Sequence, residues 1–411
     1  MIGNRVKDYI HSNLLIAPIV LRWLLPVGIE YSLYLNVQGL YFFLPDILYI
    51  LYIINYRGNK CLFKNKEIIN LLLCFLFVFC FFMLLIQEGH IIYKLNIFLN
   101  NYNFILIPLI YINWPLDRAG LENIKYTLIF SLIVLFCEVL LYGTGILVYT
   151  SAAGNDLTEG LIVTGGIMRI STTVGAATGT GLIILMLGCL VTGYYKMSSV
   201  MTYILLIIIS IALLFTISRG SILSWTLYLV FYFYKKLKNI SFARIIFYGF
   251  VLIISLSILN SNGVFEPLAN RMESTEGDIS TGRSELNNEA INLISASDLL
   301  GVGVGNVYPD KIVQFEYKDL IPNYVGMHNI YLTYLAEIGL IGLITILLIY
   351  LLLLKQVGLK QATSFAIVCI MLINFNTEAI FVDQEYIALF FLLINTSLNN
   401  INSKAEIKRY N

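Results

Sequence analysis

Apolar segments about as long as a membrane-crossing helix recur along most of this sequence. A transmembrane helix needs about 20 consecutive, mostly apolar residues. Twelve segments approach this length and predict an all-α polytopic membrane protein of about 12 transmembrane helices. They are residues 14–35, 37–56, 68–86, 95–114, 122–148, 173–195, 199–217, 219–234, 244–260, 327–354, 361–378 and 379–398.

The composition excludes several other classes of protein. The 411 residues are 58% hydrophobic and only 12% charged, whereas soluble proteins carry about 25% charged residues. The net charge of +1 argues against a nucleic-acid partner, because such proteins usually show a basic excess. The six cysteines include no CxxC pair, and all but Cys61 lie in apolar segments. This pattern favours small packing residues over a disulfide framework or a zinc site.

The apolar segments divide the chain into four regions. Residues 1–260 are predicted to form transmembrane helices 1–9 with short loops, and residues 261–326 form one large loop. Residues 327–398 supply helices 10–12, and residues 399–411 form a tail. The large loop holds ten acidic residues against four basic ones. Loops of this length usually have a function of their own.

The basic residues predict how the chain is oriented in the membrane. With an even number of spans and both termini in the cytoplasm, 18 of the 26 Lys and Arg residues lie on the cytoplasmic side. Cytoplasmic loops carry such an excess in membrane proteins. Arg22 is ambiguous, and the large loop lies on the outer side.

A helix is predicted inside the large outer loop. Its apolar residues recur at helical spacing, and it ends at the segment Asp298-Leu299-Leu300-Gly301. We expect this amphipathic helix to lie on the outer surface of the membrane domain. A smaller outer loop at residues 149–172 is rich in Gly, Thr and Ser, so the chemistry is expected on the outer face. The apolar positions of the helix are Leu286, Ala290, Ile291, Leu293 and Ile294.

Arg219 stands out among the few basic residues of the outer side. It lies in Ser218-Arg219-Gly220-Ser221, a break of a few residues between two apolar segments. One interpretation is an arginine that snorkels to the interface at a helix end. The other is an anion clamp, because an arginine and the N-terminus of a helix both suit phosphate oxygens.

Two further outer-side arginines have less distinctive surroundings. Arg169 precedes a stretch rich in Gly, Ala and Thr at residues 171–181, which allows either close helix packing or close approach of a ligand. Arg283 lies just before the amphipathic helix. Considered alone, an exposed loop arginine is most often solvated surface.

His328 opens the apolar segment that follows the large loop, in Met327-His328-Asn329. A lone histidine at a helix start is usually an interfacial residue. An imidazole could also act there as a general base, because its pKa lies near neutrality. The nearby Gly301-Val302-Gly303-Val304-Gly305-Asn306 lacks the last glycine of a dinucleotide fingerprint and is predicted to be a turn closing the amphipathic helix. The sequence contains no Walker, HExxH or GxSxG motif.

The order of these motifs resembles the O-antigen ligase/polymerase superfamily of bacterial inner membranes, over roughly residues 165–350. Ser-Arg-Gly at a helix break is followed by Gly-Arg, by the glycine-rich turn, and by His-Asn-x-Tyr-Leu-x-x-Leu-x-Glu-x-Gly-Leu-x-Gly. The stretch from His328 to Gly342 is the most specific part. The glycines after Arg169, Gly179 and Gly181, match the family spacing only loosely.

The resemblance implies a GT-C-like glycosyltransferase that acts on the periplasmic side of the inner membrane without a metal or other cofactor. By this analogy, Arg219 and Arg283 hold the diphosphate of an undecaprenyl-diphosphate-linked oligosaccharide, and Arg169 contributes from the smaller loop. His328 would deprotonate the acceptor hydroxyl. The implied surroundings are the lipid bilayer and, as protein partners, a chain-length regulator and a flippase.

Several functions are compatible with the sequence, and a protein-glycosylating ligase of the same superfamily is one of them. We favour an O-antigen polymerase, which lengthens the O-antigen on its lipid carrier in lipopolysaccharide biosynthesis. The first alternative is an O-antigen ligase, which transfers the finished polymer to lipid A-core. The alternative from another class is a flippase for lipid-linked oligosaccharides. A flippase is expected to have charged residues along a central cavity and internal repeats. No duplication between the two halves of this sequence is evident.

Overall fold

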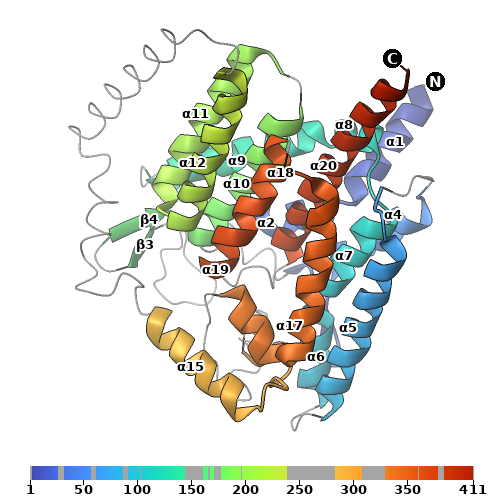
Figure 1. Cartoon of the computed structure of the whole chain (residues 1–411), viewed down its shortest axis with the longest axis vertical. Helices are drawn as coiled ribbons and strands as arrows, with labels where there is room; N and C mark the ends of the chain where they lie inside the picture. The colour runs from blue at the N-terminus through green and yellow to red at the C-terminus, as the bar shows by residue number, and fades with distance from the viewer. Residues whose placement is uncertain are drawn as a thin grey trace.

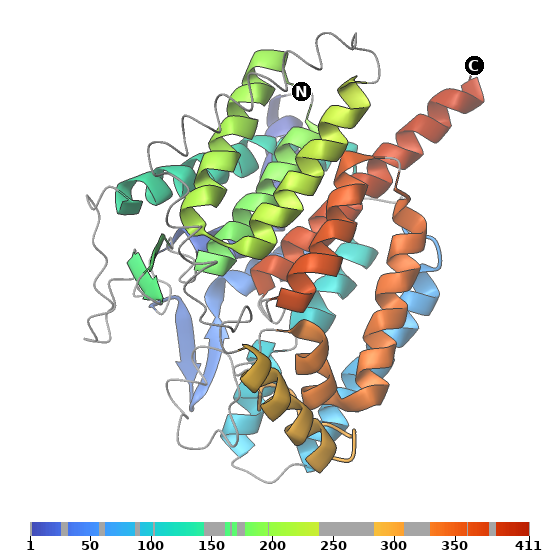
Figure 2. The same ribbon diagram turned by 60° about the vertical axis from the view of Figure 1, so that its left-hand side comes forward.

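The chain folds into a bundle of helices whose two termini lie at the same end (Figures 1 and 2). Helix α15 (Arg283–Ala296) lies at the opposite end of the molecule (Figure 1). These observations come from a computed structural model. It describes residues 2–25, 32–56, 62–86, 91–101, 103–143, 161–164, 167–170, 177–195, 197–237, 283–307, 329–359, 361–377 and 384–410.

Within the described residues, four stretches of helix are long and apolar enough to cross a membrane, and these confirm the predicted all-α polytopic class. They are Lys66–Leu85, Arg118–Leu141, Ser199–Thr216 and Ile330–Val357. Shorter apolar helices cover Leu44–Ile54, Phe104–Asn113, Thr178–Tyr194 and Ala362–Thr377. The expected number of about 12 spans stays a prediction, since several predicted spans include residues outside the described part, such as 244–260.

The corresponding elements follow the predicted segments closely in most of the chain. The long helices are α5 (Lys66–Ile86), α8 (Arg118–Asn123) with α9 (Lys125–Gly143), α11 (Ser199–Thr216), α12 (Arg219–Leu237), α17 (Ile330–Val357) and α20 (Gln384–Tyr410). The predicted segment 95–114 is divided into α6 (Ile91–Asn101) and α7 (Asn103–Asn113). Helix α20 continues to Tyr410, through residues that were predicted to form a tail.

The N-terminal region differs from the prediction. Helices α1 (Ile2–Leu14) and α2 (Ala17–Leu24) are followed by a hairpin of β1 (Tyr34–Val37) and β2 (Leu40–Phe43), where a helix was expected from residue 37. The 3-10 turn η1 (Leu44–Asp46) and the eight-residue α4 (Ile47–Ile54) complete it.

The physical reason for the hairpin lies in its two-residue turn. Gln38 and Gly39 both have positive φ, 55° and 86°, as a type I′ turn requires. The Gly39 N–H also donates a hydrogen bond of 2.9 Å to Asn36 Oδ1. Asn96 on α6 then holds the hairpin, because its Oδ1 accepts from the Tyr41 N–H and its Nδ2 donates to the Gly39 carbonyl.

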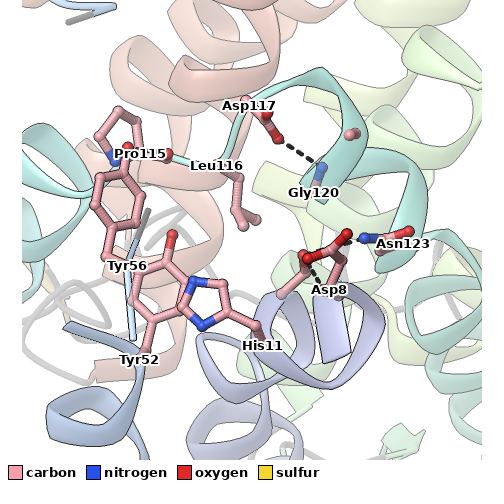
Figure 3. A pocket seen from close by; sticks show the side chains of 11 residues that line it. Asp8, His11, Tyr52, Tyr56, Pro115, Leu116, Asp117, Gly120 and Asn123 are labelled. Atoms are coloured by element: carbon pink, nitrogen blue, oxygen red, sulfur yellow. Dashed lines mark hydrogen bonds between the residues drawn. The ribbon is translucent and has the colours of Figure 1, made fainter. Parts of the chain in front are cut away.

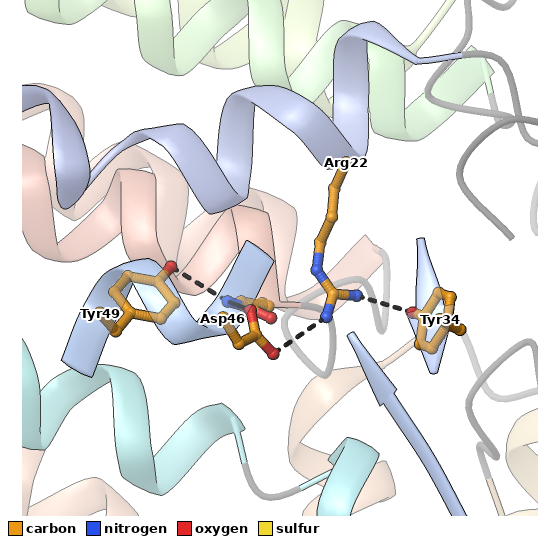
Figure 4. A network of polar contacts seen from close by, with 5 residues as sticks. Arg22, Tyr34, Asp46 and Tyr49 are labelled. Atoms are coloured by element: carbon orange, nitrogen blue, oxygen red, sulfur yellow. Dashed lines mark hydrogen bonds and ion pairs between the residues drawn. The ribbon is translucent and has the colours of Figure 1, made fainter. Parts of the chain in front are cut away.

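Arg22, whose side of the membrane the sequence left ambiguous, is paired in the structure (Figure 4). Its guanidinium lies 3.5 Å from Asp46 Oδ2, donates to the Tyr34 hydroxyl, and stands 4.0 Å from the centre of the Phe43 ring. Gln384 at the start of α20 donates to Asp46 Oδ1 at 3.0 Å. This network joins α2, the hairpin, η1 and α20, and partners of this kind are expected for a cation at membrane depth.

Helices α10 (Ala177–Tyr194) and α20 form the centre of the bundle. Residues 182–191 of α10 and 386–394 of α20 are buried without interruption, which is the pattern of a helix surrounded by other helices. Two glycines allow the close packing around α10. A Cβ on Gly188 would lie 3.0 Å from Ile209, and a Cβ on Gly193 would lie 2.6 Å from Thr363.

The C-terminal part of the chain contains a change of helix type. Helix α18 (Ala362–Cys369) continues into the π-helical turn η3 (Ile370–Asn374) and the short α19 (Phe375–Thr377). Such π-helical turns are rare and occur frequently at functional sites. A second hairpin, β3 (Leu161–Thr164) and β4 (Ile167–Ile170), lies in the smaller predicted loop.

Candidate functional site

The predicted break at Arg219 is present and has a defined geometry. Helix α11 ends at Thr216, and Ile217 takes a left-handed conformation with φ 50°. Ser218 then begins the next helix, since its carbonyl accepts from the Ile222 N–H and its hydroxyl lies 3.0 Å from the Ser221 hydroxyl. Arg219 is therefore the first residue of α12, and it is half-buried.

Helix α10 packs directly against this break through a glycine of the small-residue stretch. A Cβ on Gly181 would lie 2.8 Å from Ser218 Cβ and 3.0 Å from Thr216 Oγ1. Only a residue without a side chain fits there without displacing its neighbours. At this position, the small-residue stretch thus serves the packing of α10 against the start of α12.

The η3–α19 turn packs on another side of the same break. A Cβ on Gly220 would lie 2.7 Å from Thr377 Oγ1 and 3.0 Å from Asn374 Oδ1. The buried Asn374 also donates a hydrogen bond of 2.9 Å to the Ser224 hydroxyl on α12. The first turns of α12 are therefore joined to η3–α19 by both packing and hydrogen bonding.

The start of α17 reaches the same turn from the other side. Asn329 caps this helix, because its Oδ1 accepts from the N–H groups of Tyr331 and Leu332 at 2.9 and 3.1 Å. The Tyr331 hydroxyl donates to the Met371 carbonyl at 3.4 Å, and its ring centre lies 6.2 Å from that of Phe375. The η3–α19 turn therefore lies between the starts of α12 and α17.

Helix α15 packs along the first half of α17, residues 330–338. Together they form a small apolar cluster of Ala290, Ile294, Val307 and Ala336, with Leu293, Val302, Leu332 and Leu335 around it. The segment after α15 meets α17 near Gly339, where Leu340 N–H donates to the Leu299 carbonyl at 2.9 Å. The end of α15 therefore meets α17 at Gly339, where the first part of α17 ends. Of the predicted apolar face, Ile291 is 50% exposed and does not belong to this cluster.

The glycine-rich segment 301–306 forms the predicted turn after the amphipathic helix. Its three glycines have φ values of 90°, 95° and 77°, a region that favours glycine. Asn306 closes it by donating to the Val302 carbonyl at 2.7 Å and accepting from the Tyr93 hydroxyl on α6 at 3.1 Å.

The structure describes the positions of the four predicted site residues to different extents. Arg219 begins α12, and Arg283 is the first residue of α15, although its side chain lies outside the described part. Arg169 lies in β4 opposite Ile162, and that hairpin strand contacts α9 and α11. His328 lies outside the described residues and directly precedes Asn329. The described backbone thus brings the starts of α12 and α17 together around η3–α19, and the roles of all four residues stay predictions.

Sequence reasoning missed Asn374 and the whole η3–α19 turn. The available signal was the polar pair Asn374 and Asn376 inside a predicted span, because polar residues at membrane depth are rare and often functional. The pairing of Asn374 with α12 could not be read from the sequence, since 150 residues separate it from Ser224.

A separate cavity of about 470 Å³ is lined by residues of α1 and α8 (Figure 3). These helices lie at the end of the molecule that carries the termini (Figure 1). Side chains of α1, of the region around α4 and of α8 line the cavity, and the His11 ring stacks on Tyr52 with centres 4.6 Å apart. Asp8 and Asp117 add carboxylates. Because α15 lies at the opposite end, this cavity is not part of the candidate site.

The comparisons with known proteins concern the same part of the chain. A family model described as "O-Antigen ligase" matches residues 204–347. The matched region contains Arg219, Arg283 and His328, as well as α15 and the glycine-rich turn, whereas Arg169 and η3–α19 lie outside it. No curated protein matches this chain.

Proposed function

From the O-antigen ligase domain at residues 204–347, which places this chain in the O-antigen ligase/polymerase superfamily, we propose that it is an O-antigen polymerase. In this proposal it transfers oligosaccharide from an undecaprenyl-diphosphate carrier on the periplasmic face of the bacterial inner membrane. Both termini are then cytoplasmic, and a chain-length regulator and a flippase are the expected protein partners.

The observation that supports this site best is the meeting of two helix starts at one turn. Gly220 of α12 and Tyr331 of α17 both contact η3–α19, although they lie more than 100 residues apart in the sequence. Helix N-termini attract anions because their first N–H groups have no partner within the helix. This argument concerns α12, because Asn329 already accepts from the N–H groups of Tyr331 and Leu332 at the start of α17. Arg219 at such an N-terminus suits one phosphate of a lipid diphosphate, and His328 precedes the other helix.

The proposed reaction needs a base and a stabilised leaving group. The acceptor hydroxyl attacks the anomeric carbon of the donor sugar and gives its proton to His328. The bond between that carbon and the diphosphate oxygen breaks, and the diphosphate leaves on the undecaprenyl carrier. Arg219 and Arg283, with Arg169 from the smaller loop, stabilise its negative charge. In this scheme the arginines take the place that a divalent cation has in other glycosyl transfers.

An O-antigen ligase is the second candidate, and it is the activity that the description of the matching family names. Ligase and polymerase share the lipid-linked donor and the same chemistry at the anomeric carbon. They differ in the acceptor, which is lipid A-core for the ligase. The acceptor is therefore what an experiment must identify.

The test uses a strain that depends on this protein and displays its lipopolysaccharide on a gel. Deletion is expected to leave core carrying a single repeat, as loss of a polymerase does, whereas bare core would indicate a ligase. His328→Ala at normal membrane levels should reproduce the deletion. His90→Ala is the matched control, because the sequence places His90 in a short outer loop away from the candidate site. This variant should keep the full ladder. A full ladder from His328→Ala would refute the general-base role.

A further inference from the structure

The glycine-rich turn and α17 touch each other through backbone atoms. A Cβ on Gly301 would lie 2.6 Å from the Gly339 nitrogen and 2.7 Å from the Glu337 carbonyl oxygen. From the other side, a Cβ on Gly339 would lie 2.5 Å from the Leu299 oxygen and would also overlap the Leu300 oxygen. Backbone atoms cannot rotate away as a side chain can, so neither position has room for any side chain.

Gly339 also breaks α17 and so provides hydrogen-bonding groups for the turn. Its φ of 67° and ψ of −173° lie outside the helical region, so α17 has a kink at this residue. Figure 1 shows the change of direction along α17. The break frees two carbonyls of the helix, and Ala336 and Glu337 accept from the N–H groups of Val302 and Gly303 at 2.7 Å each. These short backbone contacts allow the glycine-rich turn only one position along α17.

These contacts add a fixed point at the end of α15. The cluster between α15 and α17 consists of Ala290, Ile294, Val307 and Ala336, and larger apolar side chains surround it. Side-chain packing holds the two helices together, whereas the backbone contacts of the glycine junction fix the end of α15 against α17. Because α15 is one continuous helix, the position of this end also determines where its start, Arg283, lies.

We propose that Gly301 and Gly339 are positioning residues, which hold α15 so that Arg283 at its start serves the site at the start of α17. This inference rests on the proposed function. According to this proposal, the two glycines influence the transfer reaction because they determine the position of Arg283. A misplacement of about 1 Å can reduce the rate by about 100-fold, and we expect a loss of this order for Gly339→Ala.

Gly358 provides a matched control for this substitution. It follows α17 with φ 62° and ψ 149°, so an alanine there also meets an unfavourable backbone conformation. Nothing lies within 4 Å of a Cβ at Gly358. Gly358→Ala should therefore retain most of the polymerised product on the gel, because it shares the backbone strain and lacks the contact. Equal losses for Gly339→Ala and Gly358→Ala at equal membrane levels would overturn the proposal.

A double substitution separates positioning from a general effect on structure. Arg283→Lys keeps the charge but not the forked hydrogen bonding, so partial activity is expected. If Gly339 acts through Arg283, then Gly339→Ala should reduce activity much less in the Arg283→Lys background than in the wild type. A reduction by the same factor in both backgrounds would overturn the proposal. Full activity of both Arg283→Lys and Arg283→Ala would overturn it too, while an inactive His328→Ala would leave the proposed function standing.

A measurement of the distance between α15 and α17 tests the proposal independently of enzymatic activity. Spin labels on cysteines at Ile291 of α15 and Ile344 of α17, which are 50% and 48% exposed, can be introduced after the six native cysteines are replaced. Gly339→Ala and Gly301→Ala should each shift or broaden the distance between the labels, and Gly358→Ala should not. An unchanged distance in both glycine variants would overturn the proposal.

Discussion

The side-chain amide of Asn374 donates a hydrogen bond of 2.9 Å to the hydroxyl of Ser224, and both residues are buried. This bond ties the π-helical turn η3 to α12 five residues after Arg219. Because Tyr331 of α17 contacts the same turn, the bond connects the two helix starts of the candidate site.

Replacing Asn374 by Ala should therefore impair both stability and activity. The Ser224 hydroxyl would lose its partner, and a buried polar group left without a partner costs about 1–3 kcal/mol. Asn376→Ala is the control, since that side chain is exposed and, among the described residues, donates to the Leu372 carbonyl of the adjoining η3 turn. Thermal unfolding in detergent and the lipopolysaccharide ladder measure the two effects. Identical behaviour of the two variants would contradict the connecting role of Asn374.

The cap of α17 supports a second prediction. Asn329→Ala removes both hydrogen bonds to the first turn, and loss of such a cap typically costs about 1 kcal/mol. Because His328 precedes this residue, we expect shorter or fainter O-antigen ladders. Asn329→Ser should preserve the cap and most of the activity. If alanine and serine variants give the same ladder as the wild type, the cap does not influence the site.

A third prediction concerns the bond between α6 and the glycine-rich turn. Tyr93→Phe removes the hydroxyl that donates to Asn306 Oδ1, which is expected to destabilise the fold by about 1 kcal/mol. Tyr126→Phe changes a hydroxyl on a side chain that is 68% exposed and should leave the unfolding temperature unchanged. Equal unfolding temperatures for the wild type and Tyr93→Phe would show that the bond contributes nothing.

The predicted orientation can be measured by labelling single cysteines. Glu289 on α15 and Leu359 after α17 are both exposed, and the sequence places them on opposite sides of the membrane. In a cysteine-free background, a membrane-impermeant maleimide should label Glu289→Cys in cells with a permeable outer membrane. Leu359→Cys should react only after the inner membrane is opened. The reverse labelling pattern would show that the site faces the cytoplasm and that the predicted orientation is wrong.

Several features could be predicted because they depend on local sequence. Apolar length predicted most helices to within a few residues, and Ser218-Arg219-Gly220 indicated the break at which α12 begins. Helix α15 and the turn after it also follow from residue spacing and from glycines. The hairpin at residues 34–43 was missed, because its apolar strands resemble the start of a span and only the Gln38-Gly39 turn distinguishes them.

By itself, the sequence determined the class of protein and the residues that could carry chemistry. Hydropathy and charge act over segments of about 20 residues, so they can be read without knowing the fold. Only the tertiary structure decided which helix starts meet. Asn374 reaches Ser224, and Gly301 reaches Gly339, through packing between segments that are distant in the chain. A glycine in the sequence indicates that another segment can approach closely there, because it has no side chain. Which segment does so depends on how the helices pack.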